Sequence, residues 1–371
     1  MQTNNPQTNS KRRSLRARLF GIIMFFAANG IVIWLTARRE FGGGKAADAL
    51  PLKEAWQQVP GNRYWLLAAL AAVLLAIALD TIKYRCILHT AVNDGRISLA
   101  LETFIVGKYY DYITPMGAGG QPFQAFSLHR HGFDWGKCTS VPIMAFILNQ
   151  AAFSLLALAS LLAGTAVEGI TPWIRICAWI GILCYLVLPV FLTIMTLVPR
   201  TAGKILHGLL RLWHRLRPAS DPDEIHRRLE RSLQSYMTAL REMWRDRRLL
   251  AIEAFCALGY HLLIAMLPYC VLRAFGVCLP FWATAATCFI IYSAIAFIPT
   301  PGNAGAAEGM FYIIFSAIAV QGCVFWCMLV WRLFCYYIFL LLGLLLMLKQ
   351  AVTGLYRNKA DCTEEGNGAE P

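Results

Sequence analysis

The chain has 371 residues, of which 58% are hydrophobic and 15% are charged. A soluble protein fills its cores with fewer apolar side chains, about half of its residues. Apolar blocks of roughly 18 or more residues recur along the sequence, which matches the thickness of a bilayer core. The composition therefore excludes a soluble globular protein and predicts an all-α, polytopic membrane helix bundle.

The formal net charge of +13 is unevenly distributed. Basic residues precede the first apolar block, and twelve Lys or Arg lie between Arg200 and Arg248. The short loops near Glu168, Gly276 and Gln321 carry almost none. This positive-inside pattern predicts that residues 1–18 and 199–248 lie in the cytoplasm. Membrane orientation thus accounts for the positive charge, and we expect no specific nucleic-acid binding.

In chain order, the sequence predicts a basic cytoplasmic N-terminus (1–18), a transmembrane domain (19–348) and a polar cytoplasmic tail (349–371). Within the domain, the apolar blocks predict membrane spans at 19–36, 64–82, 140–165, 173–198, 249–275 and 323–348. From Asp223 onward, apolar residues recur at helical spacing opposite an Arg-rich and Glu-rich face. This pattern predicts an amphipathic cytoplasmic helix that lies on or under the membrane domain.

Residues 97–131 form the first broken element. The helix over 97–113 reaches only about 24 Å, which is too short to cross the bilayer. It breaks at Thr114-Pro115 and restarts after Gly119-Gly120. Because both ends are basic, we expect this helix pair to enter the membrane from the cytoplasm and to return there.

Residues 281–321 form the second broken element, with its break at Pro301, Gly302 and Gly305 and a new helix that carries Glu308 in its first turn. The charge distribution requires it to enter from the opposite side. Both breaks share the pattern Thr-Pro-x-x-Ala-Gly, so we expect an inverted repeat, which is typical of transporters. Non-helical backbone at membrane depth persists only where protein or water covers it, so each break is a candidate binding site.

Glu308 is the strongest candidate at the second break, because an ionisable residue in a membrane usually faces a cavity or a partner. It could bind substrate or a proton, or it could stabilise the first turn of its helix. Gly302 and Gly305 could let backbone approach a headgroup, or they could only let helices pack closely. Arg332 also needs a partner within its span, and Glu308 is one candidate.

Lys108, Asp111 and Arg130 flank the first break. A cation near a helix N-terminus suits a lipid phosphate, and a carboxylate suits an ammonium group. Lys108 and Asp111 could instead pair with each other along one helix. The full set of predicted substrate-binding residues is Thr114, Pro115, Gly119, Gly120, Lys108, Asp111, Arg130, Pro301, Gly302, Gly305, Glu308 and Arg332.

The sequence predicts no metal site, cofactor or catalytic residue. The twelve cysteines are scattered through apolar blocks, and Cys323 and Cys327 have no further ligand at zinc spacing. No phosphate-binding loop, dinucleotide fingerprint or Ser/His/Asp constellation is evident. We interpret the cysteines as small buried hydrophobic residues.

The segment Pro301-Gly302-x-x-Gly305-x-x-Glu308, together with the Thr-Pro and Gly-Gly-x-Pro element at 114–122, resembles the lysylphosphatidylglycerol synthase/flippase transmembrane family over nearly the whole chain. The resemblance implies re-entrant helices around a lipid-accessible cavity. It also implies a phospholipid substrate of the lysylphosphatidylglycerol or phosphatidylglycerol type, and resistance of a bacterium to cationic antimicrobial peptides. The expected location is the bacterial plasma membrane, with both termini in the cytoplasm.

Two departures from the family pattern bear on function. Asn303 stands where the family usually has a glycine, and only about twenty polar residues follow Leu348, too few for the soluble synthase of the full-length family members. We therefore expect phospholipid translocation, which would be passive, ion-coupled or driven by a partner. The alternatives are a phosphatidylglycerol lysyltransferase that takes lysine from lysyl-tRNA, and a membrane anchor that binds a separately encoded synthase through residues 199–248.

Overall fold

A computed structural model describes residues 52–58, 63–115, 117, 119–166, 170–197, 222–296, 298, 300, 302–303, 305–316 and 323–350. The predicted first span, the basic N-terminus, Pro301 and most of the polar tail lie outside these residues. The regular elements described are helices: α2 (Leu52–Gln58), α3 (Tyr64–Val92), α4 (Ile97–Ile113), α5 (Gly120–Arg130), α6 (Trp135–Ala163), α7 (Pro172–Leu197), α9 (Pro222–Arg245), α10 (Arg247–Ala274), α11 (Phe281–Ala294), α12 (Ala306–Phe315) and α13 (Val324–Arg332), which a π-helical turn (Leu333–Tyr337) continues.

Five helices in this part of the chain are long and apolar enough to cross a membrane: Tyr64–Val92, Trp135–Ala163, Pro172–Met195, Arg247–Ala274 and Val324–Gln350. Large apolar side chains such as Leu67, Trp173 and Leu183 are exposed on them, as expected of a surface that faces lipid. The all-α membrane bundle predicted from the sequence is confirmed.

Helix α3 continues to Val92, beyond residue 82, where the sequence predicts the end of a span. Asp80 and Lys83 are buried within this helix. Paired charges can be tolerated inside a helix bundle. The structure thus places two charged side chains within the packed bundle.

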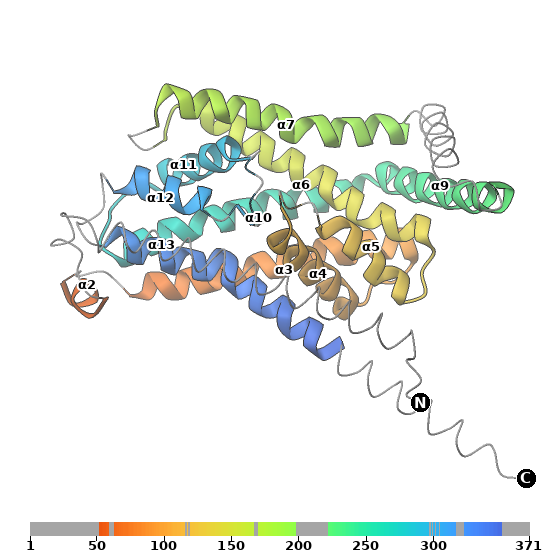
Figure 1. Ribbon diagram of the computed structural model, residues 1–371, viewed down its shortest axis with the longest axis horizontal. Coiled ribbons are helices and arrows are strands. Elements are labelled where there is room, and N and C mark those ends of the chain that lie inside the picture. Colours follow the sequence, from red (N-terminus) through yellow and green to blue (C-terminus); the bar gives the residue numbers. More distant parts are fainter. Residues whose placement is uncertain are drawn as a thin grey trace, which may run out of the picture.

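The helices form a bundle in which α10 and α6 are central (Figure 1). Helix α3 packs along α10, and α7 packs against α6 and α11. The contact between α7 and α11 is close because Gly181 has no side chain: a Cβ there would overlap the carbonyl oxygen of Ser293. Small residues at such crossings are typical of helix packing in membranes.

The two broken helix pairs lie at opposite ends of the bundle (Figure 1). Short connections join α4 and α5 to α3 and α6 at the end where α9 lies, which we call the α9 end. Helices α11 and α12 connect to α10 and α13 at the other end, where α2 lies, which we call the α2 end. Each pair therefore begins and ends at its own end of the bundle, and the two ends are opposite, as predicted. An internal repeat that relates them remains a prediction.

Helix α9 confirms the predicted amphipathic segment. Its apolar residues Met237, Leu240 and Met243 are buried, and α9 packs against α6 and α3. At Gly136 of α6, a Cβ would overlap the carbonyl oxygen of Ser232, so this contact also depends on a glycine. The C-terminal part of the apolar face of α9, which the structure describes, is therefore covered by the bundle itself.

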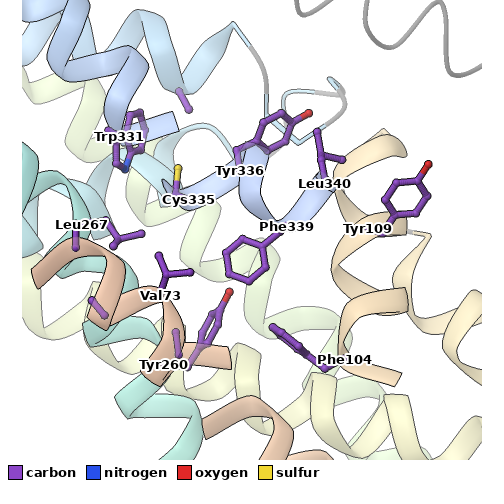
Figure 2. Close-up of a cluster of buried hydrophobic side chains, with 14 of the residues drawn as sticks. Val73, Phe104, Tyr109, Tyr260, Leu267, Trp331, Cys335, Tyr336, Phe339 and Leu340 are labelled. Carbon is purple, nitrogen blue, oxygen red and sulfur yellow. The ribbon is translucent and has the colours of Figure 1, made fainter. Parts of the chain in front are cut away.

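The last helix contacts both broken pairs, α12 near its start and α4 farther along. Figure 2 shows Phe339 at the centre of a buried cluster, with Tyr260 and Val73 on one side and Phe104 on another. The rings of Phe104 and Phe339 meet edge to face with their centroids 6.1 Å apart. Aromatic packing of this kind fixes the position of α4 against the last helix.

Candidate functional site

The first break is built by local hydrogen bonds between the two helices that it joins. Thr114 Oγ1 donates to the carbonyl of Tyr110 (2.7 Å) and accepts from the backbone N–H of Gly119 (2.9 Å). The N–H of Gly120, at the start of α5, donates to Asp111 Oδ1 (2.9 Å). A Cβ at Gly120 would overlap this carboxylate. The predicted residues Thr114, Gly119 and Gly120 thus shape the turn.

A polar pocket lies beside this break, within the apolar bundle. The cavity itself has a volume of about 50 Å³, and the partly open space around it amounts to about 400 Å³. Residues of α3, α4, α5 and α6 line it, so it lies within the first half of the described chain. The charged and amide side chains in its lining are Asp80, Lys83, Lys108, Asp111, Gln121, Gln124 and Asn149.

The charges on α3 form a buried ion pair. Lys83 Nζ lies 2.5 Å from Asp80 Oδ1, and the two side chains are 2% and 3% exposed. Within the described residues, no donor reaches this oxygen with hydrogen-bond geometry. The carboxylate of Asp80 therefore has a close cation but no directed hydrogen bond, so it could still accept one from a ligand.

The charges on α4 are held separately. The ammonium group of Lys108 lies 4.5 Å from the centroid of the Tyr260 ring on α10, while Asp111 binds the N–H of Gly120. No ion pair within 4 Å joins Lys108 and Asp111 in the described structure, although the charge of Lys108 still acts on the Asp111 carboxylate. An aromatic face and a backbone donor from other helices take the place of that pair. Both charges remain in the pocket wall.

Gln124 positions α5 against the pocket. Its amide nitrogen donates to Tyr84 Oη (2.8 Å) and to the carbonyl of Thr103 (2.9 Å). The side chain crosses α4 at Gly107, where a Cβ would overlap it. The contact joins α3, α4 and α5 through one buried amide.

Of the predicted residues of the first element, only Lys108 and Asp111 line the pocket. Thr114, Gly119 and Gly120 form the turn beside it. Arg130 is exposed at the C-terminal end of α5, and Pro115 is exposed at the break itself.

The described residues of the second break are half-buried and form a tight turn. Gly302, Asn303 and Gly305 have φ angles of 56°, 54° and 85°, which is the left-handed region where a glycine or asparagine fits best. Glu308 Oε2 accepts from the N–H of Gly305 (2.7 Å), which satisfies a free donor at the start of α12. The predicted capping interaction of Glu308 is therefore present.

Glu308 also forms a buried ion pair across the bundle. Arg332 Nε lies 2.7 Å from Glu308 Oε1, and the two side chains are 4% and 5% exposed. The guanidinium group also donates to the carbonyl of Asn303 (3.4 Å) and lies over the Trp331 and Tyr336 rings. The contact between Glu308 and Arg332 suggested by the sequence is confirmed.

Tyr336 connects the two breaks. Its ring occupies the space that a side chain at Gly302 would take, and its hydroxyl donates to the carbonyl of Tyr112 at the end of α4 (3.4 Å). In return, the hydroxyl of Tyr112 donates to the carbonyl of Cys335 (3.0 Å). Tyr336 lies in the π-helical turn that follows Arg332, and such turns are frequent at functional sites.

The sequence analysis missed three buried charged residues as site candidates: Asp80, Lys83 and Glu253. Glu253 on α10 is fully buried, and neither of its carboxyl oxygens has a hydrogen-bond partner in the described structure. The available signal was the presence of ionisable residues inside apolar blocks, which marks a functional site in membrane proteins.

The arrangement is suited to binding an amphoteric ligand. Two ammonium groups and two carboxylates line one pocket, and they could contact a phosphate and an ammonium group of the same molecule. Within the residues that the structure describes, no three His, Cys, Asp or Glu side chains gather as a metal site. The pocket can therefore bind charged groups of a ligand inside the helix bundle.

Comparison with known proteins agrees with this architecture. The family described as the lysylphosphatidylglycerol synthase TM region matches residues 17–343. No curated protein matches the sequence significantly. Because the family match covers most of the chain, the protein belongs to the lysylphosphatidylglycerol synthase transmembrane-region family.

Proposed function

We propose that the protein binds the headgroup of a phospholipid of the lysylphosphatidylglycerol or phosphatidylglycerol type in the polar pocket and moves the lipid between the two leaflets. The pocket between α3, α4, α5 and α6 is the observation that carries this proposal. Membership of the family links the chain to lysylphosphatidylglycerol. The acyl tails would stay in the surrounding lipid while the headgroup crosses.

The physical reason is the cost of moving a charged headgroup through hydrocarbon. An ionised group without a partner costs many kcal/mol to bury in an apolar medium. Lys108 could pair with the lipid phosphate, and Asp111 or Asp80 could pair with an ammonium group of the headgroup. These contacts would replace the water that the headgroup loses.

In this proposal, the second break closes the path of the headgroup toward the α2 end. The ion pair of Glu308 and Arg332 fills it, and Tyr336 links it to the end of α4. In this proposal, the headgroup leaves the first pocket toward the α2 end when the packing around Tyr336 opens. The pocket side would face the cytoplasm of a bacterium, in its plasma membrane.

The biological consequence would be protection from cationic antimicrobial peptides. Lysylphosphatidylglycerol carries a net positive charge, so its transfer to the outer leaflet would weaken the attraction of that leaflet for cations. A separately encoded enzyme would supply the lysylated lipid.

The test is leaflet transfer of fluorescent phosphatidylglycerol and lysylphosphatidylglycerol in liposomes that contain the purified protein. We expect wild type to accelerate transfer of at least one of the two lipids over protein-free liposomes, and Lys108→Gln to slow that transfer roughly tenfold or more, because it loses one charge-assisted contact of about 1.5–3 kcal/mol. The matched control is Lys137→Gln, which removes an exposed lysine at the start of α6 and should leave transfer unchanged. No acceleration of either lipid by wild type would overturn the proposal.

A further inference from the structure

Glu253 is a buried acid that the proposed binding pocket does not use. It lies in the first half of α10, against α3, and has no exposed surface. Neither of its oxygens has a hydrogen-bond partner among the described residues. An ionised carboxylate in this position would have lost its water without gaining a donor, and a buried acid avoids that cost by holding a proton.

The groups that face Glu253 come from α3 and α10. The ammonium group of Lys83 attracts its charge and the carboxylate of Asp80 repels it. The remaining titratable groups that interact with it are Tyr84 and Cys86 on α3 and Cys256 on α10. Lys83 is therefore the cation that can serve either of two carboxylates, Asp80 or Glu253.

Lys83 is engaged by Asp80 in the described structure, and both residues also line the pocket. An ammonium group that enters the pocket could bind Asp80 in place of Lys83. Lys83 would then be available to Glu253, and a cation close to a carboxyl group favours loss of its proton. Occupancy of the pocket and protonation of Glu253 are in this way linked through one side chain.

We propose that Glu253 is a proton-binding site whose proton is released when the cationic headgroup of a lipid binds in the pocket. This inference rests on the proposed function, because it requires that headgroup as the ligand. Before binding, Asp80 and Lys83 carry opposite charges and Glu253 is neutral. After binding, Asp80 pairs with the headgroup ammonium, Lys83 pairs with the Glu253 carboxylate, and one proton has passed to the aqueous phase.

The exchange is electrically balanced for a lipid of net charge +1. Lysylphosphatidylglycerol has one phosphate and two ammonium groups, so the movement of one lipid against one proton transfers no net charge. At equilibrium, one pH unit across the membrane would then support about a tenfold ratio of the lipid between the leaflets. A proton gradient would therefore supply the driving force for export.

The first experiment is infrared spectroscopy of the whole protein in phosphatidylglycerol vesicles at neutral pH. We expect a C=O stretching band of a protonated carboxylic acid in wild type, and its loss in Glu253→Gln. Addition of lysylphosphatidylglycerol should remove the same band from wild type, while further phosphatidylglycerol should not. The matched control Glu242→Gln, which changes an exposed carboxylate on α9, should keep the spectrum of wild type.

Folding of the variant can be checked independently. Glutamine has the shape of a protonated glutamic acid, so Glu253→Gln should unfold at the same denaturant concentration as wild type. A strongly lowered midpoint would show that an ionised Glu253 supports the fold through Lys83, and it would overturn the proposal. Absence of a Glu253-dependent infrared band, or a band that does not respond to lysylphosphatidylglycerol, would overturn it as well.

Leaflet transfer in the same vesicles separates this inference from the proposed function. If wild type moves lysylphosphatidylglycerol but a one-unit pH gradient produces no unequal distribution, proton coupling is wrong and translocation stands. If the band responds to lysylphosphatidylglycerol but no lipid moves, translocation is wrong and the linked binding of lipid and proton stands. Glu253→Gln should move the lipid without the tenfold accumulation.

Discussion

Buried charges are the single-residue features that set this protein apart from an ordinary apolar bundle. Glu308 and Arg332 pair closely at the second break, where the N–H of Gly305 and the carbonyl of Asn303 also bind them, although Arg332 Nε has no directed hydrogen bond in the described structure. Asp80 and Lys83 at the first pocket pair closely but lack directed hydrogen bonds at Asp80 Oδ1. Backbone contacts therefore hold the pair of Glu308 and Arg332, while no such contact holds the Asp80 carboxylate or the Lys83 ammonium group in the described structure.

This difference predicts the outcome of removing one partner at the second break. Glu308→Gln or Arg332→Met alone should each lower the free energy of unfolding by roughly 3–5 kcal/mol, because each leaves an uncompensated buried group. The combined variant should lose less than the sum of the two, because it buries no lone charge. Denaturant unfolding in detergent micelles measures all three variants. Additive losses would show that the two residues do not support each other.

At the scale of secondary-structure elements, the breaks depend on backbone conformations that few residues can adopt. The second break turns through Gly302, whose φ angle of 56° and contact with the Tyr336 ring leave no room for a Cβ. The first break is closed instead by the side chains of Thr114 and Asp111, which bind the backbone of the following turn. The two elements share a sequence pattern but use it differently.

The conformation of Gly302 predicts a position-specific effect of alanine. Gly302→Ala should destabilise the protein by about 1–3 kcal/mol, since alanine is strained at this φ and would displace Tyr336. Gly309→Ala, seven residues later in α12, is the control, because a Cβ there meets nothing within 4 Å. Alanine should stabilise that helix by about 0.5–1 kcal/mol. Equal effects at the two positions in a thermal unfolding assay would contradict the described break.

At the scale of the whole molecule, the two broken pairs give the bundle two different ends. The α9 end carries the amphipathic helix and the short links around α4 and α5, and the α2 end carries the links of α11 and α12. Of the basic segments of the sequence, the described helix α9 lies at the first of these ends. By the positive-inside rule, we expect this end to face the cytoplasm.

Thiol labelling in intact cells tests this orientation. Cys278 is exposed in the connection between α10 and α11 at the α2 end, so a membrane-impermeant maleimide should label it when every other cysteine is replaced by alanine. A cysteine introduced as Lys137→Cys at the α9 end, in a background that also lacks Cys278, should react only after the cells are permeabilised. The opposite pattern of labelling would reverse the orientation and the proposed direction of transport.

Much of the architecture was predictable from the sequence because its signals are local. Apolar blocks of bilayer length predicted the spans, and the proline and glycine clusters at 114–122 and 299–305 predicted the breaks. The spacing of apolar residues predicted α9, whose described bounds are Pro222–Arg245. The contact between Glu308 and Arg332 was also foreseeable, because two isolated charges in apolar surroundings need partners.

Tertiary structure alone decided which charges share a pocket. Lys108 and Asp111 have the spacing of a helical ion pair, yet Lys108 lies over the ring of Tyr260, which is distant in sequence, and Asp111 accepts from the N–H of Gly120 in the next helix. Asp80 and Lys83 resembled the polar end of a span, and only the packing of α3 against α10 buries them beside Glu253. Local sequence thus determined which segments can span a membrane and where helices begin and break. The first depends on the length of an apolar block, and the second on the conformations open to the backbone. The electrostatic environment of each charge depends on the neighbours that the fold supplies.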